Sequence, residues 1–156
     1  MSALRRAGAL SFLFLVADGC HPKSSCDLKV QLEQRAGSGA KDCGNGTSDA
    51  GIADTDACVV SSFEKSQAFF AQYPRAGDDS QVVFGISSDG KGHVAFLTFD
   101  SDPGGGSGKE PVINGRICNG PDIDTSSDRD PATTPPITCA STTNLGATCG
   151  PVSARR

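Results

Sequence analysis

The cysteines constrain this chain more than any other feature of its sequence. The chain has 7 of them in 156 residues, and an exported chain usually pairs its cysteines as disulfides. An odd number leaves one thiol that needs another explanation. Cys20 differs from the rest by position, because it directly follows an apolar N-terminal segment. The other six can form three disulfides: Cys26, Cys43, Cys58, Cys118, Cys139 and Cys149.

The N-terminal segment is typical of a signal peptide. Residues 1–6, MSALRR, carry two arginines, and the apolar run AGALSFLFLVA follows from Ala7 to Ala17. This run is much shorter than the roughly 20 residues that span a bilayer, which favours export over a retained membrane helix. We therefore expect residues 1–19 to be removed as a signal peptide.

The stretch ADGC, which ends at Cys20, resembles the lipobox of bacterial lipoprotein precursors. Gly19 and Cys20 match that pattern, whereas Ala17 and Asp18 depart from its usual aliphatic and small residues. The resemblance implies a diacylglyceryl group on Cys20, which anchors a protein at a membrane without a membrane-binding surface of its own. His21 differs from the aspartate that retains some lipoproteins at the inner membrane, so outer-membrane placement is favoured. Ala17 and Gly19 also satisfy an ordinary signal-peptidase site, and a secreted soluble protein is the alternative.

The aromatic residues indicate where the core lies. After residue 20 they all fall within one part of the chain: Phe63, Phe69, Phe70, Tyr73, Phe84, Phe96 and Phe99. The flanking segments are rich in Gly, Ser, Thr, Asp and Pro, which bury too little apolar area to offset the entropy of ordering. We predict a tether at 20–42, a core domain at 43–120 and an irregular, disulfide-attached tail at 121–156. DLKVQLEQ in the tether alternates apolar and polar residues, so it also fits a short edge strand.

Within the core, the sequence predicts one helix followed by several strands. Asp54 or Thr55 suits the N-cap of a helix over 55–67. Asp89-Gly90 suits a hairpin turn. Strand-like segments lie on both sides of that turn, at 68–77, 80–88, 93–100 and 111–118.

The predicted fold class is α+β: one N-terminal helix packed on a small antiparallel meander sheet, stapled by disulfides, with an irregular C-terminal tail. Over roughly residues 43–139 this arrangement resembles small uncharacterised cysteine-bearing bacterial lipoproteins. The resemblance rests on pattern alone and implies no catalytic residues.

The preferred disulfides follow from where the cysteines lie. Cys43–Cys58 would join the predicted helix to its approach, and closing that loop contributes about 3 kcal/mol. Cys118–Cys139 and Cys26–Cys149 would attach the tail. Six cysteines allow other pairings, which the sequence alone leaves open.

Few residues suggest chemistry. Asp100 and Asp102, in FDSDPGGGSGKEP, alternate as the first two ligands of a calcium loop do, but Gly104 replaces the third carboxylate and Pro111 the final glutamate. A solvated turn has the same composition. His93 is interpreted as an exposed or half-buried strand residue. We therefore expect no catalytic residue, no cofactor and no structural metal, with Asp100 and Asp102 kept as the calcium candidates.

The sequence thus predicts a lipid-anchored protein of the bacterial envelope that acts as a binding or structural module and not as an enzyme. A protein partner could use the sheet face near Val94 and Phe96, provided that the chain's own tail does not cover it. The net charge of −4 offers no basic patch for nucleic acid. The alternative is a secreted soluble protein with a calcium or small-molecule site near Asp100 and Asp102.

Overall fold

The computed structural model describes residues 26–76, 80–106, 110–126, 128–131 and 134–149. In this part of the chain the helices and strands follow in the order α1 (Leu28–Ala36), β1 (Lys41–Asn45), α2 (Asp49–Glu64), β2 (Phe69–Ala76), β3 (Gln81–Ser88), β4 (Val94–Asp100), β5 (Val112–Ile123) and β6 (Ile137–Cys149). Of these described helices, neither is long and apolar enough to cross a membrane.

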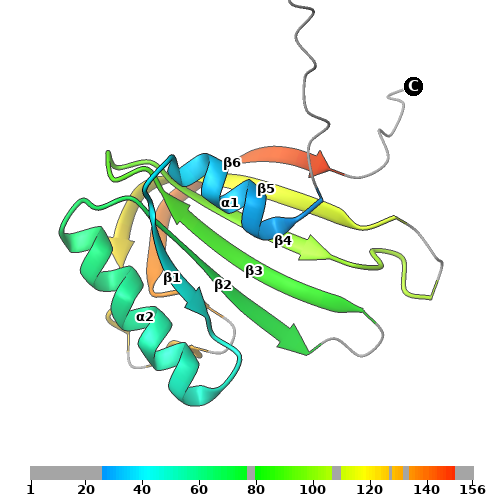
Figure 1. Cartoon of the computed structure of the whole chain (residues 1–156), viewed down its shortest axis with the longest axis horizontal. Coiled ribbons are helices and arrows are strands. Elements are labelled where there is room, and N and C mark those ends of the chain that lie inside the picture. Colours follow the sequence, from blue (N-terminus) through cyan, green and yellow to red (C-terminus); the bar gives the residue numbers. More distant parts are fainter. Residues whose placement is uncertain (1–25, 77–79, 107–109, 127, 132–133, 150–156) are drawn as a thin grey trace, which may run out of the picture.

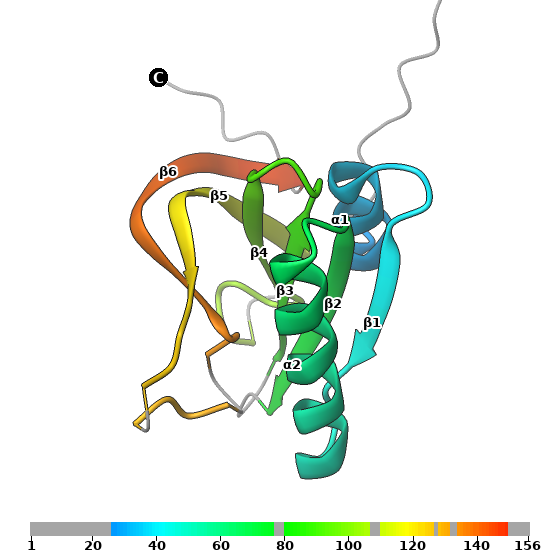
Figure 2. The same ribbon diagram turned by 90° about the vertical axis from the view of Figure 1, so that its left-hand side faces the viewer.

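The strands form one sheet in which neighbours along the chain are neighbours in space, from β1 at one edge to β6 at the other (Figure 1). β1 runs parallel to β2, with helix α2 as their connection, and the remaining pairs are antiparallel. Figure 2 shows that the sheet is strongly curved, with β5 and β6 bent round at one side and α2 at the other.

This architecture overturns the predicted fold class of one N-terminal helix on a small meander with an irregular tail. The sheet has six strands, a helix packs on each of its faces, and a regular strand of 13 residues lies within the predicted tail. The differences lie in four elements: α1, α2, β6 and the strand β1, which the sequence analysis did not predict and which runs parallel to β2.

Helix α1 lies in the predicted tether. The Asp27 side chain caps it by accepting a hydrogen bond from the Val30 amide at 3.2 Å. Leu28, Leu32 and Ala36 are buried, and their four-residue spacing puts them on one face of a helix. Leu28, Val30 and Leu32 also alternate with polar residues, which is why the same segment resembles an edge strand. Two of the same residues thus serve both patterns, and packing on the sheet selects the helix.

Helix α2 begins earlier than predicted. Its N-cap is Ser48, not Asp54 or Thr55, and the Ser48 side chain accepts a hydrogen bond from the Gly51 amide at 3.2 Å. The first turns of the helix, DAGIAD, carry little apolar surface, so hydrophobic spacing does not reveal them.

Strand β6 has the sequence ITCASTTNLGATC, which is mostly exposed and lacks the apolar alternation of a half-buried strand. It pairs along β5 from Ile123 opposite Ile137 to Ile113 opposite Cys149. Its β-branched threonines suit an extended backbone. The strand therefore depends on its neighbour rather than on a hydrophobic pattern of its own.

The sheet separates two hydrophobic clusters, one under each helix. The cluster under α1 contains Leu28, Leu32, Ala36, Phe70, Val83, Leu97, Ile113 and Cys149. The cluster under α2 contains Cys43, Val59, Phe69, Ala71, Tyr73, Ile86, Val94, Phe96, Cys118 and Ile137. Helix α1 approaches β3 very closely, because a Cβ atom at Gly85 would lie 2.6 Å from the Cδ1 atom of Leu32. Any larger residue at this position would force the buried Leu32 side chain to move, so glycine fits here best.

The six described cysteines form three disulfides. Cys43–Cys58 joins β1 to α2, Cys118–Cys139 joins β5 to β6, and Cys26–Cys149 joins the residue before the α1 cap to the end of β6. These are the three pairs preferred from the sequence. Their Cα–Cα distances of 5.4 to 5.5 Å are normal for disulfides. Such a framework indicates an oxidising extracellular or periplasmic setting.

Candidate functional site

A cavity of about 360 Å³ opens on the sheet face that carries α2, beyond the part that the helix covers. We call it the polar groove and define it by its lining residues: Phe84, Thr98, Asn114, Gly115, Arg116, Thr142 and Asn144. They come from β3, β4, β5 and β6, and the last two of these strands bend round in Figure 2. Its volume lies at the lower end of the range of small-molecule sites, about 300 to 1,000 Å³.

Strand register brings these side chains together. Phe84 lies opposite Thr98, and Thr98 lies opposite Asn114. One row further along, Arg116 lies opposite Asn144. Residues opposite one another in antiparallel strands have their Cβ atoms roughly 5 Å apart on the same face. A single small ligand can therefore reach side chains from both rows.

Arg116 is the charged residue of the polar groove. Its guanidinium lies over the ring of Phe96, 5.4 Å from the centroid, in a cation–π arrangement. The side chain is exposed. Among the residues that the structure describes, it makes no hydrogen bond or ion pair. Stacking on the buried Phe96 ring thus holds the guanidinium in place while its N–H donors stay available.

A second cavity, of about 240 Å³, adjoins the polar groove and shares Arg116 and Thr142 with it. The segment between β5 and β6 supplies much of its lining, including Asp124 and Thr134. The Asp124 carboxylate accepts a hydrogen bond from the Ser126 amide at 2.9 Å. That bond, one from the Ser126 side chain and the nearby Arg129 charge hold the pKa of Asp124 below its usual value.

A buried network attaches this β5–β6 segment to the rest of the fold. Arg129 donates to the Asp56 carboxylate of α2 at 2.5 Å and to the Thr134 carbonyl oxygen at 2.7 Å. The Tyr73 hydroxyl donates to the other oxygen of Asp56 at 2.9 Å. Burial raises the pKa of the Tyr73 phenol, and the adjacent Asp56 carboxylate raises it further. The network positions the wall of the second cavity and plays no part in the polar groove itself.

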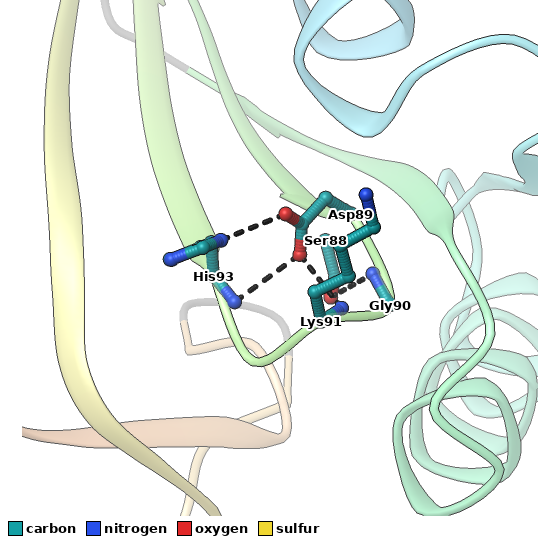
Figure 3. Close-up of polar contacts among 5 residues, drawn as sticks. All are labelled: Ser88, Asp89, Gly90, Lys91 and His93. Atoms are coloured by element: carbon teal, nitrogen blue, oxygen red, sulfur yellow. Dashed lines mark hydrogen bonds and ion pairs between the residues drawn. The ribbon is translucent and has the colours of Figure 1, made fainter.

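A third cavity, of about 150 Å³, lies at the β3–β4 turn and is lined by residues that include Ser87, Asp89 and His93. Figure 3 shows how Asp89 holds the turn. One carboxylate oxygen accepts hydrogen bonds from the Lys91 and His93 amides at 2.8 and 3.2 Å, and the other lies 2.7 Å from His93 Nδ1. Burial favours the neutral carboxyl, but the bonds from His93 and from the two amides outweigh it, so the pKa of Asp89 is lowered.

These residue types suggest a nucleophile, a base and an orienting carboxylate, but the geometry does not connect them. The Ser87 hydroxyl is buried and has no hydrogen-bond partner among the described residues, whereas His93 is exposed. A catalytic triad needs the nucleophile within hydrogen-bond reach of its base. The structure thus places His93 just before β4, as an exposed residue whose partner is the turn carboxylate.

The calcium candidates hold a turn in the same way. Asp100 ends β4 and accepts a hydrogen bond from the Asp102 amide at 3.0 Å, and Asp102 accepts one from the Gly104 amide at 3.3 Å. Within the described ranges, no three side chains of His, Cys, Asp or Glu gather as ligands for a metal ion. Cys20, the predicted lipidation site, lies outside the described residues.

The polar groove was not found from the sequence. A signal for it exists in β5, where Asn114 and Arg116 alternate with Ile113, Gly115 and Ile117, so that polar side chains share one face of the strand. Comparisons with protein-family models, with curated proteins and with solved structures gave no match for this chain.

Proposed function

We propose that this chain is a bacterial envelope protein, anchored by a lipid on Cys20, whose exported domain binds a small polar ligand and catalyses no reaction. The observation that carries the binding function is the polar groove, a cavity of about 360 Å³ lined by hydroxyl, amide and guanidinium groups. Ligand sites combine apolar surface with polar groups that fix the ligand's orientation. In the polar groove Phe84 supplies the apolar surface and the polar side chains predominate, which favours a polar ligand.

The burial of the sheet supports a small ligand over an apolar protein partner. Val94 and Phe96, the residues considered for protein docking, are 0% and 7% exposed. They belong to the cluster under α2, together with Ile137 from the start of β6. The chain therefore covers the apolar part of this face itself, and what it leaves open is polar.

The disulfides and the N-terminal sequence support export and anchoring. Every cysteine in the described part of the chain is paired, so none of those six is available as a partner for Cys20. The apolar run supports export, and Gly19 and Cys20 in the ADGC stretch at its end support lipid attachment. His21, in place of a retention aspartate, favours the outer membrane as the site of the anchor.

Intact mass spectrometry of the protein exported by a bacterium tests the anchor. We expect a mature chain that starts at Cys20, carries acyl chains and fractionates with the outer membrane. Cys20→Ser is the matched control and should remove the acyl mass while keeping all three disulfides. A mature chain with an unmodified amino terminus would contradict the anchor.

NMR titration tests the binding function. The probe is a pool of glucose, glucuronic acid, N-acetylalanine and N-acetylalanine N-methylamide, which together present hydroxyl, carboxylate and amide groups. With the ¹⁵N-labelled mature Cys20→Ser protein, we expect amide shifts at residues 114–116 and 142–144. A spectrum in which these resonances stay unchanged would remove the polar groove as the binding site.

A further inference from the structure

We infer that the polar groove recognises a carboxylate, with Arg116 as the residue that binds it. This inference rests on the proposed binding function and names the ligand class of the same site. It covers two sources of that chemistry, an acidic sugar and the C-terminus of a peptide.

The charges of the lining support an anion. Arg116 is the one ionisable side chain among the seven lining residues of the polar groove. The adjoining cavity has one carboxylate in its lining, Asp124, which is hydrogen-bonded to Ser126, and the described residues contain no ion pair between Asp124 and Arg116. The positive charge is therefore not neutralised by a fixed partner in the described structure.

The donors around Arg116 suit a carboxylate as well. Guanidinium groups bind carboxylates through two parallel N–H donors, which makes arginine the preferred residue for this task. Asn144 lies opposite Arg116, and its Oδ1 atom already accepts a hydrogen bond from the Gly146 amide at 2.7 Å. The amide nitrogen of Asn144 is then the group that can face a ligand, and it is a donor.

The remaining lining residues suit the rest of such a ligand. Thr98 and Asn114 lie opposite each other one row away from Arg116, and they offer a hydroxyl and an amide. Phe84, in the same row, offers an apolar surface for a carbon skeleton. A volume of about 360 Å³ accommodates a monosaccharide or a very short peptide end.

The four probes, used one at a time, test this inference because they form two matched pairs. Glucuronic acid and glucose differ by a carboxylate, as do N-acetylalanine and its N-methylamide. We expect at least one carboxylate to bind about ten-fold or more tightly than its neutral counterpart, since charge-assisted hydrogen bonds exceed neutral ones in strength. Whichever acid binds more tightly identifies the source, sugar or peptide.

Three variants complete the test. Arg116→Gln should weaken binding of the acid about ten-fold or more and bring it to the level of the neutral probe. Arg116→Lys keeps the charge without the paired donors and should fall between Arg116→Gln and the wild type. Lys41→Gln is the control, because it removes an exposed positive charge from β1 at the opposite edge of the sheet.

The outcomes separate the two proposals. Equal affinity for each acid and its neutral counterpart, or wild-type affinity in Arg116→Gln, would overturn the inference that Arg116 binds a carboxylate. The polar groove would remain a binding site. The absence of shifts at the groove with every probe would overturn both. A well-dispersed spectrum of each variant shows that any loss of binding is not a loss of fold.

Discussion

The contact between Gly85 and Leu32 allows a quantitative test of how α1 packs on the sheet. Gly85→Ala would place a methyl group 2.6 Å from one terminal carbon of Leu32 and 2.9 Å from the other. Leu32 is fully buried, so it has little room to move. Overpacking of this kind costs about 1–3 kcal/mol, and we expect the free energy of unfolding to fall by that amount.

Leu32→Ala decides whether the clash is the cause. Alone, it removes a buried leucine and should cost about 2–5 kcal/mol. In the double variant the methyl group added at position 85 has space, so the second substitution should cost almost nothing. The loss of stability in the double variant should therefore be smaller than the sum of the two single losses by about 1–3 kcal/mol, as expected for residues in contact.

Urea unfolding followed by far-UV circular dichroism measures these free energies, since the chain has no tryptophan for fluorescence. Gly92→Ala is the control: its φ angle of +94° strains any other residue by about 1–2 kcal/mol, but no atom lies within 4 Å of its Cβ position. Its cost should add to that of Leu32→Ala. Additivity within about 0.5 kcal/mol for the Gly85 pair as well would refute the argument.

Three further variants test the polar contacts and the disulfides. Burial and the Asp56 carboxylate raise the pKa of Tyr73 in the folded protein. The protonated phenol therefore contributes its full stabilisation below about pH 10, and this contribution is lost as the pH rises further. Tyr73→Phe should weaken this alkaline decline in the urea midpoint, and an unchanged decline would contradict it. The lowered pKa of Asp89, where hydrogen bonds outweigh burial, predicts stability that is present at neutral pH and lost as the pH falls below about 4. In Asp89→Asn the urea midpoint at neutral pH should fall and its acid dependence shrink, and a profile like that of the wild type would count against the turn contacts. Replacing Cys43 and Cys58 by alanine opens a loop with a separation of 15 residues and should cost about 3 kcal/mol in the same assay, whereas a loss below about 1 kcal/mol would show that the bond constrains little.

The strands at the centre of the sheet could be predicted because each has its own signal. β3 and β4 lie within one residue of the predicted segments 80–88 and 93–100. β3 and β4 are rich in apolar residues, which in β4 lie on both faces of the strand, and the two helices cover them. Asp89-Gly90 forms the turn between the two strands. Local sequence and tertiary burial agree in this region, so the pattern alone suffices.

The edges of the molecule could not be predicted in the same way. In α1 two of the residues that pack on the sheet, Leu28 and Leu32, fit a helix and a strand equally, so packing on the sheet decides between the two. β6 has no apolar pattern because it owes its extended form to pairing with β5. The packing surface that selects α1 and the partner strand that extends β6 both lie outside the segments concerned, so their own sequences do not reveal them.

The polar groove could not be predicted from the sequence for a related reason. Thr98, Asn114, Arg116 and Asn144 are ordinary surface residues within their own strands. They become a site only through the register of three strands, one of which was not predicted. The calcium candidates show the converse, since Asp100 and Asp102 stand close together in sequence yet bond to the backbone of their own turn.

The disulfide between Cys26 and Cys149 has a mechanical consequence. It cross-links the beginning and the end of the described fold, with a sequence separation of 123 residues. A force that pulls on the chain before Cys26 and after Cys149 is carried by this covalent bond, and the helices and strands between them bear no tension. Such a force therefore moves the domain as a whole. After reduction of the bond, the same force would detach α1 and β6 from the rest of the sheet.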